Sequence, residues 1–323
     1  MVSGDEEYRS EEALPQLARI LSKHHGFDCT VLFAQDPQKP GIVDPNYTQN
    51  IPGLEALEDA DLLVLFTRFR DLPDVQMQYF QNYLLKGKPV IAIRTATHAF
   101  NIQDSLSRWK HWGNYFNDEN SDWTGGFGQK TLGTNWYTHH GYHKHQSTRG
   151  FSTKGAESHP ITKNIHIDKI WGPADVYGLR LPLPGDAQAL VLGKVIEREG
   201  EYNENDLFFG MKATDKKLAE SNPDAENKYS PIDPMMPIVW IKSYQIEKGK
   251  QGMALTSTIG ASTDFLNQEL RILFVNGVYF LLKMPVPERV KADLVGDYSP
   301  SQFSFQSDDY WGQKNLKVSD FVE

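Results

Sequence analysis

The stretch that decides the fold is Val90-Ile91-Ala92-Ile93-Arg94-Thr95-Ala96-Thr97-His98, in which a short apolar run ends in small polar residues and a histidine. Such a run is typical of a parallel strand buried on both faces, and the abrupt change indicates a tight turn after it. Open α/β sheets bind ligands at the carboxyl ends of their strands. We therefore expect recognition or chemistry at residues 94–98, which we call the elbow.

The hundred residues that end at the elbow alternate between strand-like and helix-like patterns. Strands are predicted at 1–3, 29–33, 61–67 and 90–93. Apolar residues at helical spacing, such as Leu14, Leu17 and Leu21, fall between them. Parallel neighbours require crossover connections, so this order predicts an α/β fold with a doubly wound, mostly parallel sheet and helices on both faces.

The rest of the chain is expected to extend this domain, which we place at 1–283. Residues 101–150 and 197–234 are predicted to be insertions, the first packed over the sheet edge and the second a mobile surface excursion. Residues 284–323 are predicted to be an extension draped over the body. A helix over 266–281 should be capped by Thr263 or Asp264. Further strands are predicted at 165–177, 189–196, 236–244 and 252–259, the last two forming a hairpin across 248–250.

Composition narrows the classes of function and the cellular compartment. Lys and Arg total 33 against 42 acidic residues, and the net charge of −9 argues against nucleic-acid partners. The single cysteine, Cys29, excludes a disulfide and a cysteine-based zinc site. We expect no membrane partner, because no apolar run approaches the roughly 18 residues of a membrane helix. The first strand consists of little more than residues 1–3, so the chain is either cytoplasmic or exported with a leader absent from it.

The elbow offers an arginine, two threonines and a histidine. A threonine nucleophile without an adjacent N-terminal amine is unusual, so we expect Thr95 to contact substrate only. His98 is predicted to be a catalytic acid or base, and Arg94 a clamp for an anion or hydroxyl. In the alternative interpretation, His98 caps the helix start and Arg94 pairs with a carboxylate in the sheet.

A second cluster is Trp136-Tyr137-Thr138-His139-His140-Gly141-Tyr142-His143-Lys144-His145, with four histidines in seven residues. Imidazoles at this density suit a divalent metal such as zinc, for which His139 and His143 are the candidate ligands. They equally suit direct contact with a sugar, with His140 catalytic and Trp136 and His139 binding substrate. A purely structural role stays open as well.

Loops after two further strands should meet the elbow at one rim of the sheet. Asp5, Glu6 and Tyr8 follow the first strand, and Arg68 and Arg70 follow the third. Glu6 is predicted to be catalytic and the other four to bind substrate. Carboxylates, arginines and aromatic rings suit a polyhydroxylated ligand, although charged loops are often only solvated surface.

The loop over 259–265 lies between a strand and a helix start, which is a natural site for an anion or hydroxyl. It has neither the spacing of a P-loop nor that of the Gly-x-Gly-x-x-Gly pattern. We therefore predict no nucleotide cofactor.

Four segments together resemble the ThuA-like, or trehalose-utilisation, family: 3–10, 65–73, 94–100 and 139–143. The resemblance runs to about Lys283. The family is similar to class I glutamine amidotransferases, whose flavodoxin-like fold places a cysteine nucleophile at the elbow, followed by a histidine. On this chain those positions are Thr95 and His98, and without the cysteine we expect no glutamine hydrolysis.

The resemblance implies a bacterial protein of carbohydrate metabolism. We expect it to bind a trehalose-related sugar or keto-sugar above Thr95, with hydrolase-like or lyase-like activity. One alternative is a non-catalytic domain that binds sugar or forms a complex, and another is a metal-dependent hydrolase of a different small polar substrate. The expected partner is a small carbohydrate, and a homo-oligomer stays open.

Overall fold

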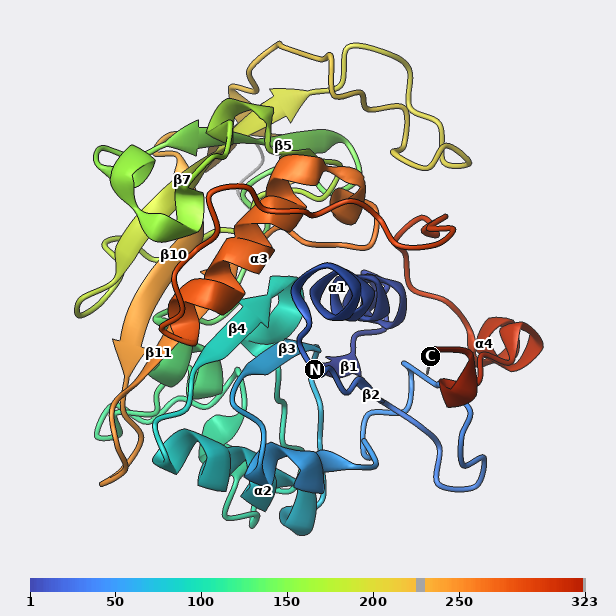
Figure 1. Cartoon of the computed structure of the whole chain (residues 1–323), viewed down its shortest axis with the longest axis vertical. Coiled ribbons are helices and arrows are strands. Elements are labelled where there is room, and N and C mark those ends of the chain that lie inside the picture. The colour runs from blue at the N-terminus through green and yellow to red at the C-terminus, as the bar shows by residue number, and fades with distance from the viewer. Residues whose placement is uncertain (225–229, 322–323) are drawn as a thin grey trace.

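The computed structural model describes residues 1–224 and 230–321, which fold around a large mixed sheet (Figure 1). In spatial order its strands are β2 (Leu32–Phe33), β1 (Val2–Gly4), β3 (Leu63–Thr67), β4 (Val90–Ile93), β11 (Gly252–Ser257), β10 (Met236–Tyr244), β7 (Gln188–Glu197), β5 (Gln146–Ser152) and β6 (Trp171–Gly172). The helices are α1 (Ser10–His25), α2 (Asp74–Leu85), α3 (Gln268–Leu281) and α4 (Asp308–Lys314). β8 (Ser221–Asn222) and β9 (Ser230–Pro231) form a separate pair.

The five neighbouring strands β2, β1, β3, β4 and β11 are all parallel. Their spatial order is the 2-1-3-4-5 order of flavodoxin-like sheets, in which chain direction across the sheet reverses between β1 and β3. The predicted fold class is therefore confirmed. It also means that the loops after β1, β3 and β4 leave the same edge of the sheet, where the candidate residues were expected.

Strand β4 shows how the sheet is covered on both sides. Ile91 and Ile93 pack in one buried cluster with residues of α1 and α3. Val90 and Ala92 point to the opposite face and pack with residues of α2. Figure 1 shows the same division, with α1 and α3 on one side of the parallel strands and α2 on the other. Since successive side chains of a strand alternate faces, an unbroken apolar run is needed to fill both layers.

The other half of the sheet is antiparallel, and several predicted boundaries, in both halves of the sheet, were wrong. The hairpin of β10 and β11 forms as predicted. The insertion at 101–150, however, ends inside β5, which pairs along its length with β7 and so belongs to the sheet. The predicted strand at 165–177 is reduced to the two residues of β6, and that at 29–33 to the two residues of β2. In 165–177, Ile167, Ile170 and Val176 are buried by packing without strand pairing, whereas Cys29 and Val31 are only partly buried.

The segment 197–234 is not a simple surface excursion. Phe209 and Met211 are buried in the main hydrophobic cluster, so this part of the chain is packed against the body. Residues 225–229 of the predicted insertion lie outside the described residues. In the extension after residue 283, Phe303 and Trp311 are buried. Its last two residues, 322–323, also lie outside the described part.

The start of α3 differs from the prediction. Asn267, rather than Thr263 or Asp264, caps the helix by accepting a hydrogen bond from the amide of Leu270. The Asp264 carboxylate instead accepts the amides of Gly260 and Ala261 at 2.8 Å. The chain's own carboxylate therefore occupies the loop that was predicted to receive an anion.

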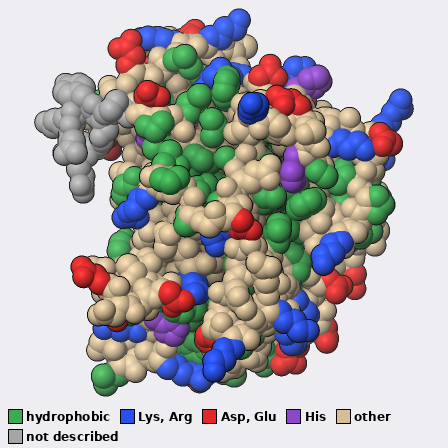
Figure 2. Space-filling model, turned by 90° about the vertical axis from the view of Figure 1, so that its left-hand side faces the viewer, with side chains coloured by type: hydrophobic (Ala, Val, Ile, Leu, Met, Phe, Trp, Pro, Cys, Tyr) green, Lys and Arg blue, Asp and Glu red, His purple; other side chains and the backbone are tan. Residues whose placement is uncertain are grey.

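The described surface carries charges of both signs. On the face in Figure 2, basic and acidic side chains are interspersed and neither sign covers a continuous area. Within the described residues, every helix is too short or too polar to cross a membrane.

Candidate functional site

A cavity of about 250 Å³ lies where the loops after β1, β3 and β4 meet the histidine-rich segment. It is lined by Glu7, Arg68, His98, Trp136, His139, His143, Lys144, Tyr177 and Phe305. Five of the predicted site residues line it: Arg68, His98, Trp136, His139 and His143. Ligands of doubly wound sheets bind at this edge, so we take the cavity as the candidate site.

Glu7 is the acidic residue of the cavity, and a tight turn positions it. The Asp5 carboxylate accepts the backbone amides of Glu7 and Tyr8, which folds the chain directly after β1. Burial, reinforced by the nearby Asp5 charge, raises the pKa of Glu7 to about 7. Its Oε1 lies 3.3 Å from Nε2 of His143. A carboxyl group with this pKa can give or take a proton near neutral pH.

One buried carboxylate, Asp175, orients two histidines of the cavity. His139 donates from Nδ1 to Asp175 Oδ2 at 2.7 Å, and His143 donates from Nδ1 to Oδ1 at 3.0 Å. Burial alone would raise the pKa of Asp175, but His139 and Arg94 hold it well below the usual range. Donation from Nδ1 leaves Nε2 of a neutral imidazole as a proton acceptor. Nε2 of His143, which lies beside Glu7, can therefore receive the proton of the Glu7 carboxyl group.

The two histidines differ in protonation. Burial disfavours the cation of His139, but the adjacent Asp175 carboxylate outweighs it and raises the pKa of His139. Burial dominates at His143 and lowers its pKa. The His139 side chain is one-third exposed, and its ring centroid lies 5.0 Å from that of His143. The pair therefore offers one imidazole biased toward the cation and one biased toward the neutral form.

His98 is held at the end of the elbow among aromatic rings. Its Nδ1 lies 3.1 Å from the hydroxyl of Thr97, and its ring centroid lies 4.8 Å from that of Phe69 and 5.3 Å from that of Trp136. Burial, with the nearby Arg68 charge, lowers the pKa of His98 well below its ordinary value. His98 is accordingly neutral at pH 7, and it can accept or donate a hydrogen bond but carries no charge.

Arg94 is a structural residue at the floor and was wrongly expected to clamp substrate. Its side chain is fully buried and sandwiched between the rings of Tyr8 and Tyr177, at 4.3 and 3.8 Å. It donates to Asp175 Oδ1 at 2.8 Å, to the carbonyl of Thr258 at 2.6 Å and to the Tyr8 hydroxyl at 3.0 Å. Tyr8 is equally buried, so neither side chain reaches the cavity. The alternative prediction, that Arg94 pairs with a carboxylate, describes its contacts.

Thr95 and Asp5, both expected to contact substrate, are also buried. The Thr95 hydroxyl donates to Asp5 Oδ2 at 2.5 Å, and both side chains are fully enclosed. The left-handed backbone of the turn, with φ of 50°, falls on Arg94 rather than on Thr95. The position of a nucleophile is thus occupied by a hydroxyl that is bonded and enclosed. The elbow itself is a turn of 3-10 helix over Arg94–His98 rather than the start of an α-helix.

Glu6 lies beside the cavity and joins the two arginines that follow β3. It accepts from Arg68 at 2.5 Å and from Arg70 at 2.6 Å. Arg70 is fully buried and also donates to the carbonyls of Pro45 and Tyr47. Arg68 remains part-exposed and lines the cavity. Glu6 therefore positions Arg68, and its ion pairs make the predicted catalytic role unsuitable; Arg70 has a structural role.

His140 lies outside the cavity, although its neighbour in sequence lines it. Its Nε2 lies 2.8 Å from the carbonyl of Ile232, and burial lowers its pKa. The backbone bridge between His139 and Tyr177 fixes the direction of this segment, and successive side chains of an extended segment point to opposite sides. His139 and not His140 therefore belongs to the site.

The cluster of His139, His143 and Asp175 suits a divalent metal in the type of its donors. One ligand atom from each lies within 4.8 Å of the others. Two imidazoles and one carboxylate are the donor set of catalytic zinc sites with an open position. Arg94 already neutralises part of the Asp175 charge, which weakens this carboxylate as a ligand. The donor set is thus compatible with zinc, with a competing cation beside it.

Four residues of the cavity, and the aspartate beneath it, were not selected from sequence. Glu7 lies in the loop after the first strand, which was predicted to reach this edge, whereas Asp175 lies in a stretch that was predicted to be a strand. Lys144 belongs to the histidine-rich segment, and Tyr177 forms a backbone bridge with His139 of that segment. Phe305 comes from the extension, and nothing in its local sequence indicates the site.

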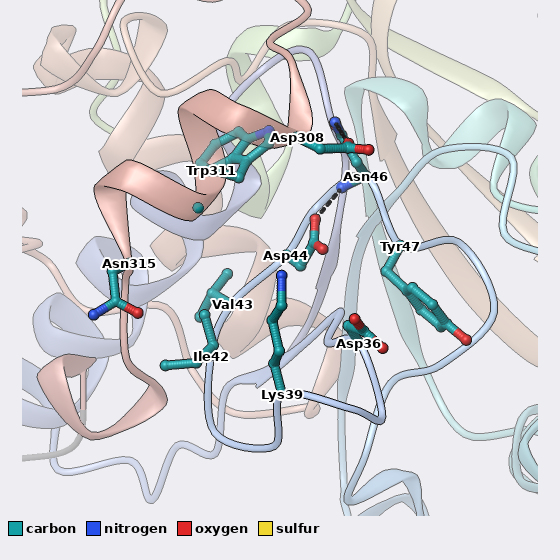
Figure 3. Close-up of a pocket in the computed structure, with 11 residues that line it drawn as sticks. Asp36, Lys39, Ile42, Val43, Asp44, Asn46, Tyr47, Asp308, Trp311 and Asn315 are labelled. Atoms are coloured by element: carbon teal, nitrogen blue, oxygen red, sulfur yellow. Dashed lines mark hydrogen bonds between the residues drawn. The ribbon is translucent and has the colours of Figure 1, made fainter.

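A larger cavity of about 400 Å³ lies elsewhere, between the loop after β2 and α4 (Figure 3). Asp36, Asp44 and Asp308 line it together with Lys39 and Trp311. Asp308 accepts a hydrogen bond from Asn46 at 2.7 Å. This cavity contains no histidine, whereas the smaller one gathers the perturbed acid and base groups expected of a functional site.

The chain is similar in structure to ThuA-like proteins. One is a crystal structure from Bacteroides uniformis, with 16% identity and a TM-score of 0.48, covering 87% of this chain and 89% of that one. Another is from Parabacteroides merdae, with 13% identity and a TM-score of 0.46, covering 94% of this chain and 95% of that one. No family model matches the chain, and no curated protein matches it. At these identities the likeness says nothing of residues or activity.

Proposed function

We propose that this chain is a ThuA-like protein that binds a sugar or keto-sugar in the cavity and transforms it by acid–base chemistry. The observation that carries the proposal is the pairing of Glu7, with a pKa of about 7, and His143 at 3.3 Å in an aromatic-walled cavity. Aromatic faces suit the apolar faces of sugar rings, and Arg68 and the imidazoles suit their hydroxyls. The resemblance to the trehalose-utilisation family supports a trehalose-related ligand.

The chemistry follows from the charges of the lining groups. A keto group makes the hydrogen on the neighbouring carbon acidic. The Glu7 carboxylate takes that proton, the carbon–hydrogen electron pair moves toward the carbonyl oxygen, and protonated His139 donates to the developing oxyanion. This step is the start of a lyase-like reaction. A nucleophile from the protein is not required, which agrees with the enclosure of Thr95.

The test is binding and turnover of trehalose, glucose and their keto derivatives by the parent and by Glu7→Gln. We expect calorimetry to detect binding of the single-ring sugars to both proteins, and Glu7→Gln to lose about 100- to 10,000-fold in turnover. Glu55→Gln, an exposed carboxylate change far from the site, is the matched control and should be unchanged. Binding of these sugars without any turnover by the parent would select a non-catalytic sugar-binding domain instead. Absence of binding would contradict the proposal.

The donor set of His139, His143 and Asp175 favours one second candidate, a zinc-dependent hydrolase of another small polar substrate. Bound zinc would supply a hydroxide at neutral pH, and the two imidazoles would hold it. Elemental analysis of the purified protein distinguishes the candidates. Stoichiometric zinc that is lost in a His139→Ala/His143→Ala variant would support the hydrolase, and its absence would remove it.

A further inference from the structure

The C-terminal extension reaches the candidate site and is fastened to the loop that carries Glu7. The amide of Ser304 donates to the carbonyl of Glu7 at 2.9 Å, and Lys144 donates to the Ser304 hydroxyl at 3.3 Å. Further along, the side chain of Asn46 donates to the carbonyl of Gln306 at 3.0 Å. The backbone on both sides of Phe305 is therefore fixed to the body.

Phe305 and its neighbour Phe303 have different environments. Phe303 is fully buried, with ring centroids 5.2 Å from Tyr8 and 5.7 Å from His143. Phe305 lines the cavity and is 52% exposed. The guanidinium carbon of Arg68 lies 4.8 Å from its ring centroid. Phe303 thus anchors the extension, while Phe305 projects over Arg68 at the mouth of the cavity.

An anchored extension that leaves a large aromatic side chain half exposed gains little folding free energy from that side chain, because burial of apolar surface is what stabilises. Its position instead limits the space beside Arg68. At about 250 Å³ the cavity is smaller than the roughly 300–1,000 Å³ of sites that enclose drug-sized ligands. The cavity is partly open to solvent, and its volume has the size class of one sugar ring rather than two.

We propose that Phe305 is a specificity-determining residue that restricts the enclosed ligand to a single sugar ring. The inference rests on the proposed function and deepens it by naming the size of the ligand. The ring of Phe305 packs on the apolar face of the sugar, and its edge blocks the space that the second ring of a disaccharide would need. Discrimination thus comes from steric exclusion as well as from attraction.

The experiment compares Phe305→Ala with Phe151→Ala. Phe151 is a matched control because it is a part-exposed phenylalanine with a cation, Lys194, 4.4 Å from its ring centroid, on a strand outside the cavity. Calorimetry measures the affinities for glucose, trehalose and their keto derivatives. We expect Phe305→Ala to raise the affinity for disaccharide relative to monosaccharide at least about tenfold, and Phe151→Ala to leave the ratio unchanged.

A second readout does not depend on sugar binding. Phenylglyoxal modifies accessible arginines, and mass spectrometry of peptides reports the rate at Arg68. Removal of the wall should raise this rate severalfold in Phe305→Ala and leave it unchanged in Phe151→Ala. If the parent binds sugar and Phe305→Ala has the same ratio of disaccharide to monosaccharide affinity as the parent, the inference is overturned. An unchanged rate of Arg68 modification in Phe305→Ala overturns it as well. If the parent binds no sugar, the proposed function fails, and ligand selection by Phe305 fails with it. A raised rate of Arg68 modification in Phe305→Ala would then show only that Phe305 shields Arg68.

Discussion

The elbow and the histidine-rich segment lie side by side and are built in opposite ways. At the elbow, Arg94 and Thr95 are fully enclosed, and the two terminal guanidinium nitrogens of Arg94 and the hydroxyl of Thr95 are bonded to protein partners. In the histidine-rich segment, His139 and His143 are each held by Asp175 through Nδ1, Nε2 of His143 lies beside Glu7, and both rings keep part of their surface in the cavity. The strand end thus provides the rigid floor, and the segment beside it provides the reactive groups. Asp175 connects the two, because it accepts from both.

Replacement of Arg94, at the floor of the cavity, should have the largest effect on stability. Arg94→Met leaves the buried Asp175 carboxylate without its permanently charged partner, and breaking a buried ion pair in this way costs about 3–5 kcal/mol. Urea unfolding measures the loss. Arg180→Met, at an exposed arginine, is the control and should cost about 1 kcal/mol or less. A loss of stability below about 1 kcal/mol in Arg94→Met would contradict the claim that the ion pair of Arg94 with Asp175 holds the floor of the cavity in place.

The ionisation of Glu7 gives a smaller effect that depends on pH. Its pKa is about 7 in the folded protein and lower in the unfolded chain. The folded state therefore binds more protons than the unfolded state between these values, and the parent loses stability as pH rises toward 7. The Glu7→Gln variant lacks this pH dependence of stability, because a side-chain amide does not ionise in this range. The unfolding free energy of Glu7→Gln relative to the parent should increase by about 1–3 kcal/mol between pH 5 and pH 8.

Urea unfolding at both pH values measures this difference. Glu55→Gln is again the control, since Glu55 is exposed and its replacement should give the same difference at the two values. A constant offset between Glu7→Gln and the parent would show that the carboxyl group beside His143 has an ordinary pKa. The acid–base role of the cavity would then lose its main support.

Replacement of Thr95 tests whether the elbow is structural, in contrast to the reactive histidine-rich segment. Thr95→Val keeps the shape of the side chain but removes the hydroxyl that donates to Asp5. The buried carboxylate oxygen then lacks that partner, which costs about 1–3 kcal/mol of stability. Turnover per folded molecule should stay within about twofold of the parent, because no covalent step uses this hydroxyl. Circular dichroism with urea and a turnover assay separate the two effects, and a selective loss of turnover would make Thr95 a nucleophile after all.

The smallest effect is expected at His140. Its ring contacts the carbonyl of Ile232 and not the cavity, so His140→Ala should change sugar affinity by no more than about twofold. His139→Ala removes a charged donor from the cavity and should weaken binding at least about tenfold. Calorimetry with the same keto-sugar compares them. Equal losses in both variants would place the ligand somewhere other than the cavity lined by His139.

The sequence predicts β3 and β4 well because 63–66 and 90–93 are unbroken apolar runs. It predicts β5 poorly, since Gln146–Ser152 is polar and becomes a strand only by pairing with β7. Loop order correctly brought His98 and Arg68 to one edge. It did not reveal that Arg94 and Arg70 turn inward, because burial of a charge depends on partners distant in sequence. Phe305 lines the cavity only because of the path that the C-terminal extension takes, which its local sequence does not indicate.

The most direct measurement is exchange of the acidic carbon-bound hydrogen of a keto-sugar in deuterated water, followed by proton nuclear magnetic resonance. Proton abstraction by Glu7 predicts that the parent and His140→Ala accelerate exchange at the carbon beside the keto group, and that Glu7→Gln slows it about 100-fold or more. Exchange at the uncatalysed rate in the presence of the parent, or equal acceleration by Glu7→Gln, would contradict an acid–base role for this cavity.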